Sequence, residues 1–292
     1  MPEVFDAVKN ILFPVDFSLQ SDGAAQFVRA YAQRFDAQVT LLHVLESRDY
    51  IFTGPEFDGI DVADLRLRHR AHAQHQLDGY LLDAFPPGRN CRVLMEGDPA
   101  TKIVERAAAG NTDLIMMPTH GLGPFRRFVL GSVTAKVLHD AACPVWTGVH
   151  LEGAPPAQTI SFDHILCALD FGEQTESLLE WVKQNAGGAK VTLVHAVPAT
   201  DALPEKYFNI EFFAELCRMA KEDMEQLQAK AGTDYHSLLR GGSPAKVIAE
   251  AATELGADVV VIGRGAAKEG FARLRAQAYG VIHTAPCPVI SV

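Results

Sequence analysis

The chain has 292 residues, of which 48% are hydrophobic, 21% charged and 8% aromatic, and its net charge is −10. This length exceeds the roughly 150 residues of one typical domain, and the composition is that of a soluble globular protein. The negative charge argues against nucleic acid as a main partner, because a polyanion would be repelled.

The sequence gives no sign of a membrane or secretory segment. Its apolar runs fall far short of the roughly 18 residues that a span needs. The first ten residues carry acidic side chains where a signal peptide carries basic ones. The five cysteines are scattered and form no CxxC pair, which favours a reducing compartment. We therefore expect a cytoplasmic protein with neither a nucleic-acid nor a membrane partner.

The chain repeats itself once. Five segments recur in the same order: residues 10–18 and 164–172, 39–44 and 191–196, 97–100 and 242–245, 113–117 and 258–262, and 142–145 and 286–289. Ordered recurrence of this kind indicates two copies of one unit. A stretch rich in alanine and proline, 151–159, has no apolar periodicity and reads as a linker. We predict domains at 1–150 and 160–292.

Within each copy, short apolar runs alternate with longer amphipathic stretches. In the first copy, the amphipathic stretches include 18–35, 61–84 and 99–109. Ser18 is a candidate N-cap, and Pro99 suits a first helical turn. The order β-α-β-α-β-α-β-α-β predicts an α/β fold: two tandem doubly wound domains, each a five-stranded parallel sheet with helices on both faces.

Ligands of such sheets bind beyond the carboxyl ends of the strands, where the strand order reverses. Asp16 follows the first strand, directly after Pro14 and Val15. Its carboxylate can accept hydrogen bonds from ribose hydroxyls or an adenine amine, or it can serve only the start of the next helix. Val44 ends the second strand. It either forms an apolar wall for a purine or is only a residue of the hydrophobic core.

A glycine-rich segment, 117–134, follows the fourth strand. Gly121 and Gly123 allow the backbone to turn sharply and to approach a ligand closely. Gly131 and Ser132 then open a helix, whose free N–H groups and dipole favour a phosphate. A purely structural turn is the alternative.

Together these motifs resemble the universal stress protein family, and the resemblance covers nearly the whole chain twice. They are Asp16 after strand one, Val44 in Leu-Leu-His-Val, Gly97-Asp-Pro-Ala, the His-Gly loop, Gly131-Ser132 and Cys-Pro-Val. ATP-binding members carry a glycine, two residues, a glycine, nine residues, then a glycine with serine or threonine. Gly121 and Gly131-Ser132 match the last two parts of this pattern, and Pro118 replaces its first glycine.

The resemblance implies an adenine-nucleotide alpha hydrolase-like fold that binds ATP, with or without Mg²⁺, in the first copy. The expected binding residues are Pro14, Val15, Asp16, Val44, Met117, His120, Gly121, Gly123, Gly131, Ser132, Val133 and Thr134. We expect no catalytic residue and no metal site built from side chains alone.

The second copy departs from this pattern at the phosphate position. Counting back from Cys287 as from Cys143 places Arg275-Ala276 where the first copy has Gly131-Ser132. An arginine there would crowd a triphosphate, although Asp170 still matches Asp16. We predict a degenerate nucleotide site and a mainly structural second domain.

The last strand of each copy, 144–149 and 288–292, is apolar and is expected at a sheet edge, which invites pairing. The resemblance implies dimerisation there. A tandem chain can satisfy it internally as a pseudo-dimer, and a further homodimer stays open.

Three classes of function remain. The first is a non-catalytic protein of the stress response whose ATP occupancy biases its shape or its partner choice. The second is an enzyme such as a slow ATPase, but the sequence lacks a Walker GxxxxGK[ST] segment and an HxGH segment. The third is a scaffold in which neither copy binds a ligand.

Overall fold

The computed structural model describes residues 7–46, 62–121, 130–149, 151–198, 210–264 and 273–292. The first repeat contains β1 (Asn10–Pro14), α1 (Leu19–Phe35), β2 (Gln38–Leu45), α2 (Val62–Gly79), β3 (Cys91–Glu96), α3 (Pro99–Ala109), β4 (Leu114–Pro118), α4 (Ser132–Asp140) and β5 (Val145–Gly148). A short 3-10 turn, Ala157–Thr159, lies between the repeats. The second repeat contains β6 (His164–Ala168), α5 (Thr175–Asn185), β7 (Lys190–Val197), α6 (Ile210–Ala231), β8 (His236–Gly241), α7 (Pro244–Leu255), β9 (Val259–Ile262), α8 (Arg273–Thr284) and β10 (Val289–Ser291).

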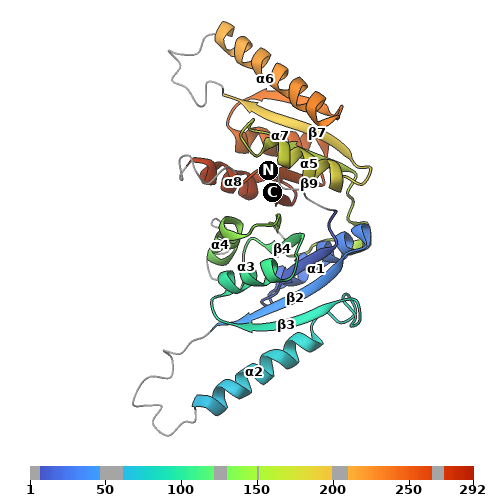
Figure 1. Cartoon of the computed structure of the whole chain (residues 1–292), viewed down its shortest axis with the longest axis vertical. Helices are drawn as coiled ribbons and strands as arrows, with labels where there is room; N and C mark the ends of the chain where they lie inside the picture. Colours follow the sequence, from blue (N-terminus) through green and yellow to red (C-terminus); the bar gives the residue numbers. More distant parts are fainter. Residues whose placement is uncertain (1–6, 47–61, 122–129, 150, 199–209, 265–272) are drawn as a thin grey trace.

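The ten strands form one continuous sheet in the order β3-β2-β1-β4-β5-β10-β9-β6-β7-β8. Every neighbouring pair within a repeat is parallel, whereas β5 and β10 pair antiparallel at the centre. The predicted fold class is therefore confirmed, including the internal pseudo-dimer. Figure 1 shows the result, with α2 and α6 at opposite ends of the molecule and the C-terminus near its middle.

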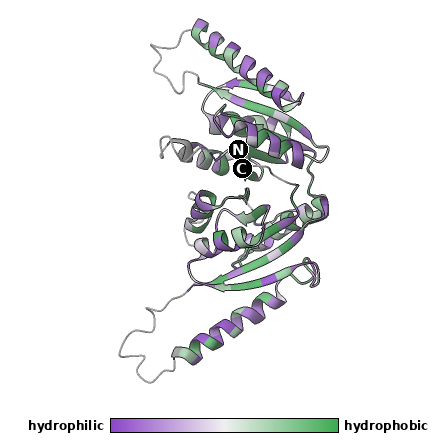
Figure 2. Cartoon of the chain, in the orientation of Figure 1, coloured by the Kyte–Doolittle hydropathy of each residue, from purple (hydrophilic) through white to green (hydrophobic). Residues whose placement is uncertain are grey.

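Helices cover both faces of this sheet. Side chains of alternate strand residues point to opposite faces, so each face has its own apolar cluster against which helices pack. Phe13, Leu41 and Trp146 belong to one apolar cluster with residues of α1 and α5. Leu12, Leu42 and Val145 belong to the other, with residues of α3, α4, α7 and α8. Each cluster contains residues of both repeats, so the two domains share their cores. In Figure 2 the strands are coloured mainly as hydrophobic, whereas the helices alternate between hydrophilic and hydrophobic residues.

The helix boundaries follow from local chemistry. Ser18 caps α1 by accepting a hydrogen bond from the Ser21 N–H, and Asp98 caps α3 in the same way from Thr101. Two predicted helices, 18–35 and 99–109, agree closely with α1 and α3. The predicted helix 61–84 ends earlier, at Gly79, because the backbone turns into a positive φ at Leu81.

Two arginines join the repeats across the central junction. Arg34 donates to the carbonyl oxygens of Ala186 (2.8 Å) and Gly187 (3.3 Å) at the end of α5. Arg264 donates to carbonyl oxygens at the end of α4, as described below. No helix among the described residues is long and apolar enough to cross a membrane.

Candidate functional site

Two predicted ligand residues meet at the carboxyl edge of the first domain. Because β1 lies between β2 and β4, strand order reverses here and a crevice is expected between the loops that follow β1 and β4. Asp16 follows β1 and Gly121 follows β4. A Cβ atom on Gly121 would lie only 2.1 Å from Oδ2 of Asp16, so a larger residue there would displace the carboxylate or the loop.

The Asp16 carboxylate is held in place by its own helix start. Its Oδ1 atom accepts hydrogen bonds from the Ser18 hydroxyl (2.5 Å), the Ser18 N–H (3.1 Å) and the Ser21 hydroxyl (2.7 Å). Asp16 therefore organises the start of α1, and its Oδ2 atom also faces Gly121; its contact with a ribose or an adenine stays a prediction. The role of Ser21 was missed, although a hydroxyl five residues after Asp16 is a visible signal.

His120 stands beside Gly121 with one ring nitrogen engaged. Its Nδ1 lies 2.8 Å from the Thr119 hydroxyl, which also donates to the Gly148 carbonyl oxygen. Its Nε2 is buried and has no hydrogen-bond partner among the residues that the structure describes. Buried polar atoms are normally paired, so an unpaired one is a position where a ligand group can supply the missing partner.

The start of α4 closes the site on the other side. Gly131 is the N-cap residue, and its N–H donates to the Thr119 carbonyl oxygen (2.9 Å). Because Gly131 has no side chain, α4 lacks the N-cap side-chain hydrogen bond that α1 and α3 have within the described part of the chain. A helix start of this kind suits an anion.

The remaining predicted residues divide by burial. Pro14, Val15 and Met117 are buried in the sheet, and Val44 and Val133 are half-buried against the α3–α4 cluster. Ser132 is exposed, while Thr134 is buried and donates its hydroxyl to the Pro118 carbonyl oxygen (3.1 Å). The Thr134 hydroxyl therefore serves the fold. Gly123 lies outside the described residues.

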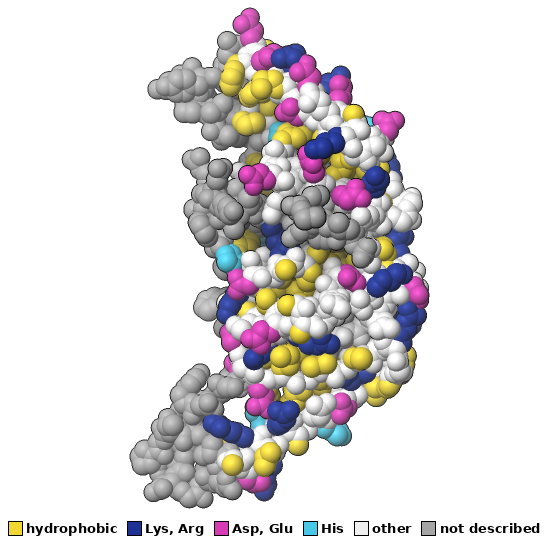
Figure 3. Space-filling model, viewed as in Figure 1, with side chains coloured by type: hydrophobic (Ala, Val, Ile, Leu, Met, Phe, Trp, Pro, Cys, Tyr) yellow, Lys and Arg dark blue, Asp and Glu magenta, His cyan; other side chains and the backbone are white. Residues whose placement is uncertain are grey.

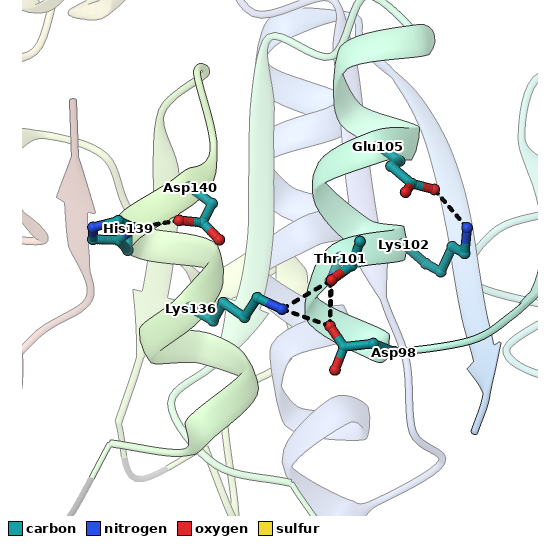
Figure 4. A network of polar contacts seen from close by, with 7 residues as sticks. All are labelled: Asp98, Thr101, Lys102, Glu105, Lys136, His139 and Asp140. Atoms are coloured by element: carbon teal, nitrogen blue, oxygen red, sulfur yellow. Dashed lines mark hydrogen bonds and ion pairs between the residues drawn. The ribbon is translucent and has the colours of Figure 1, made fainter. Parts of the chain in front are cut away.

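A polar network joins α4 to α3 beside this site, as Figure 4 shows. The Lys136 ammonium donates to Oδ1 of Asp98 (2.8 Å) and to the Thr101 hydroxyl (2.9 Å). Lys136 and Thr101 together hold the pKa of Asp98 well below its usual range. A carboxylate so stabilised is a poor general base.

A search against protein-family models matches the universal stress protein family at residues 7–147 and again at 161–292. The chain belongs to this family.

Individual relatives agree with this assignment. A Staphylococcus aureus (strain USA300) protein named for the universal stress family is 32% identical over 142 residues, which is 47% of this chain and 81% of that protein. The solved universal stress protein from Archaeoglobus fulgidus DSM 4304 has a TM-score of 0.69 at 21% identity and covers 97% of both chains. A protein of unknown function from Pseudomonas aeruginosa PAO1 has a TM-score of 0.63 at 20% identity. The match covers 98% of this chain and 92% of the Pseudomonas chain. These last two show the shared fold.

The second universal stress protein domain builds a different edge. Asp170 is exposed, and its Oδ1 accepts from the Gly172 N–H (2.9 Å) and the Thr175 hydroxyl (3.2 Å). Helix α8 begins at Arg273, so residues 275 and 276 lie inside the helix where the first domain has its N-cap and first residue. The side chains of residues 273–276 lie outside the described part. The degenerate second site remains a prediction.

Within the described part of the chain, no group of three or more His, Cys, Asp or Glu side chains is placed to hold a metal ion. Charges of both signs are interspersed on the face that Figure 3 shows.

Proposed function

We propose that the first domain binds ATP at the edge formed by Asp16, the 119–121 segment and the start of α4. The observation that carries this proposal is the N-terminus of α4, whose N-cap residue Gly131 has no side chain to cap it and which lies next to the Asp16–Gly121 contact. These parts are linked, since the Gly131 N–H donates to the Thr119 carbonyl oxygen and Gly121 faces the Asp16 carboxylate.

The residues present suit an adenine nucleotide. The uncapped N–H groups of α4 suit phosphates, and the Asp16 carboxylate suits a ribose hydroxyl or an adenine amine. Val44, half-buried at the end of β2, suits the face of a purine. Mg²⁺ would accompany the triphosphate, because protein-bound Mg²⁺ is held largely by phosphates and water.

The same arrangement favours binding without turnover. Asp98 is committed to Lys136 and to the α3 cap. ATP would then act by occupancy, biasing the conformation of the pseudo-dimer or its choice of partner in a stress response.

The test is calorimetric titration of the full chain with ATP, ADP and adenosine. We expect one ATP per chain and weaker binding of adenosine, because it lacks the phosphates that α4 would hold. A chain with no heat of binding for any of the three would favour the scaffold. Release of phosphate at a steady rate would favour the slow ATPase.

A further inference from the structure

Arg264 of the second domain occupies the position of Thr119 in the first. Each residue follows the strand that lies next to the last strand of its repeat. Each main-chain N–H donates to a carbonyl oxygen at the end of that last strand, Thr119 to Gly148 (3.1 Å) and Arg264 to Val292 (3.0 Å). Arg264 therefore stands at the ligand edge of the second domain, where Thr119 orients His120 in the first.

The Arg264 side chain leaves its own domain and reaches α4 of the first. Its guanidinium donates to the carbonyl oxygens of Ala141 and Cys143 (2.5 Å) and makes a longer contact with that of Leu138 (3.5 Å). Leu138 lies in the last turn of α4, Ala141 is the C-cap residue, and Cys143 lies between α4 and β5. The helix dipole makes this end of α4 negative, and a guanidinium fork can donate to the C-cap and to the segment after it at once while adding the favourable charge.

This contact runs in one direction across the pseudo-twofold axis. Thr119, the equivalent residue, keeps its hydroxyl within the first domain, on Gly148 and His120. The copy that lost the phosphate motif in sequence thus supports the helix of the copy that kept it.

Helix α4 has nine residues and is about 13 Å long, so a tilt at one end displaces the other. Thr134 ties its first turn to Pro118, Lys136 ties its middle to α3, and Arg264 holds its last turn.

We propose that Arg264 is a positioning residue for the nucleotide site of the other domain: it holds α4 in the orientation that binds phosphate. This inference rests on the proposed ATP binding. The second domain would then be a built-in support of the first, and the coupling would be reciprocal, with ATP strengthening the Arg264 contact.

The experiment compares Arg264→Ala with Arg34→Ala in the full chain. Arg34 is the matched control, because it also joins the domains by donating to the end of a helix, but that helix is α5. ATP affinity is measured by calorimetry, and amide hydrogen exchange of α4 is measured without nucleotide.

We expect Arg264→Ala to weaken ATP about five- to tenfold, the lower part of the usual range of couplings. Exchange at the end of α4 should accelerate. Arg34→Ala should change ATP affinity less than twofold and leave α4 exchange unchanged. Arg264→Lys, which keeps the charge and loses the fork, should fall between the wild type and Arg264→Ala.

Equal weakening by Arg264→Ala and Arg34→Ala would overturn the proposal, because it would show only a loosened junction. Unchanged α4 exchange in Arg264→Ala would overturn it whether or not ATP binds. Absence of ATP binding by the wild-type chain would instead contradict the proposed function.

Discussion

The two domains share a core and differ at their ligand edges. In both, a phenylalanine with positive φ follows the aspartate after the first strand, and its ring packs at a tilt against a histidine, Phe17 against His43 and Phe171 against His195. In both, the histidine Nδ1 lies 2.8 Å from a main-chain carbonyl oxygen of the loop after the first strand. These features position the loop, and duplication has kept them.

The edges differ in how the aspartate is held. Two serine hydroxyls hold Asp16, which is half-buried, whereas Asp170 is exposed and has a glycine in place of the first serine. A loop can therefore keep its backbone while its ligand chemistry changes, because its conformation depends on the core beneath it.

The largest effect on ATP affinity is expected when Gly131 is replaced by arginine, the residue at the equivalent position 275 of the second domain. Gly131→Arg should weaken ATP at least about a hundredfold, or about 2.7 kcal/mol, because the side chain would fill the phosphate position. A Cβ atom there would lie 3.1 Å from the Thr119 carbonyl oxygen, so Gly131→Ala is the control for the Cβ alone. Calorimetry gives the affinity, and thermal unfolding checks the fold. Tight binding by Gly131→Arg would place the phosphates elsewhere.

A second, smaller effect is expected at the contact between Gly121 and Asp16. Gly121→Ala should lower stability by about 1–3 kcal/mol and weaken ATP about tenfold, because the new methyl group displaces the carboxylate or the loop. Urea unfolding gives the stability. In the Asp16→Ala background the same change should cost less, since the clashing atom is gone. Equal costs in both backgrounds would mean that the two residues do not meet.

The two aspartates provide a direct comparison between the domains. Asp16→Ala should weaken ATP by about 1–3 kcal/mol, the range for a hydrogen bond to a charged group. Asp170→Ala should leave the affinity unchanged in the same titration. If Asp170→Ala weakened ATP as strongly as Asp16→Ala, the functional asymmetry between the domains would be wrong.

The smallest difference between the domains is expected in the reactivity of two equivalent free cysteines, Cys143 and Cys287, which precede the central strands β5 and β10. Burial raises the pKa of Cys143 to about 11 and that of Cys287 to about 12. At pH 8 each thiolate fraction is then about a thousandth or less, and it rises about tenfold per pH unit below the pKa. Iodoacetamide followed by peptide mass analysis should modify exposed Cys91 first and these two at least a hundredfold more slowly. Fast modification of Cys143 alone would show that the domains differ in their cores as well.

The fold was predictable because its signals are local. Alternating apolar and amphipathic segments gave the element order, and the recurrence of Asp16-Phe17 as Asp170-Phe171 gave the two copies. The proposed boundaries at 1–150 and 160–292 stay a prediction beside the family matches at 7–147 and 161–292.

The site was predictable only in its backbone. Gly121 was expected to let the backbone approach a ligand closely, and that stays a prediction; the sequence could not show that the Asp16 carboxylate lies against this glycine. Lys136 and Arg264 were missed because each acts on another helix, Lys136 on α3 and Arg264 on α4 of the other repeat. Such contacts depend on how helices pack, and the direction of a long side chain leaves no trace in residue spacing.

The antiparallel pair at the centre has a consequence for synthesis on the ribosome. Thr147 and Val289 are partners in register although 142 residues separate them. At roughly 5–20 residues per second, the edge of β5 waits about 7–28 seconds for β10 to be made. During that time β5 can pair with the same strand of a neighbouring nascent chain on one polysome, in the place of its own β10. The order of translation thus makes dimers joined through their β5 strands the expected misassembly product of this protein, and slower synthesis of the second repeat should increase their yield.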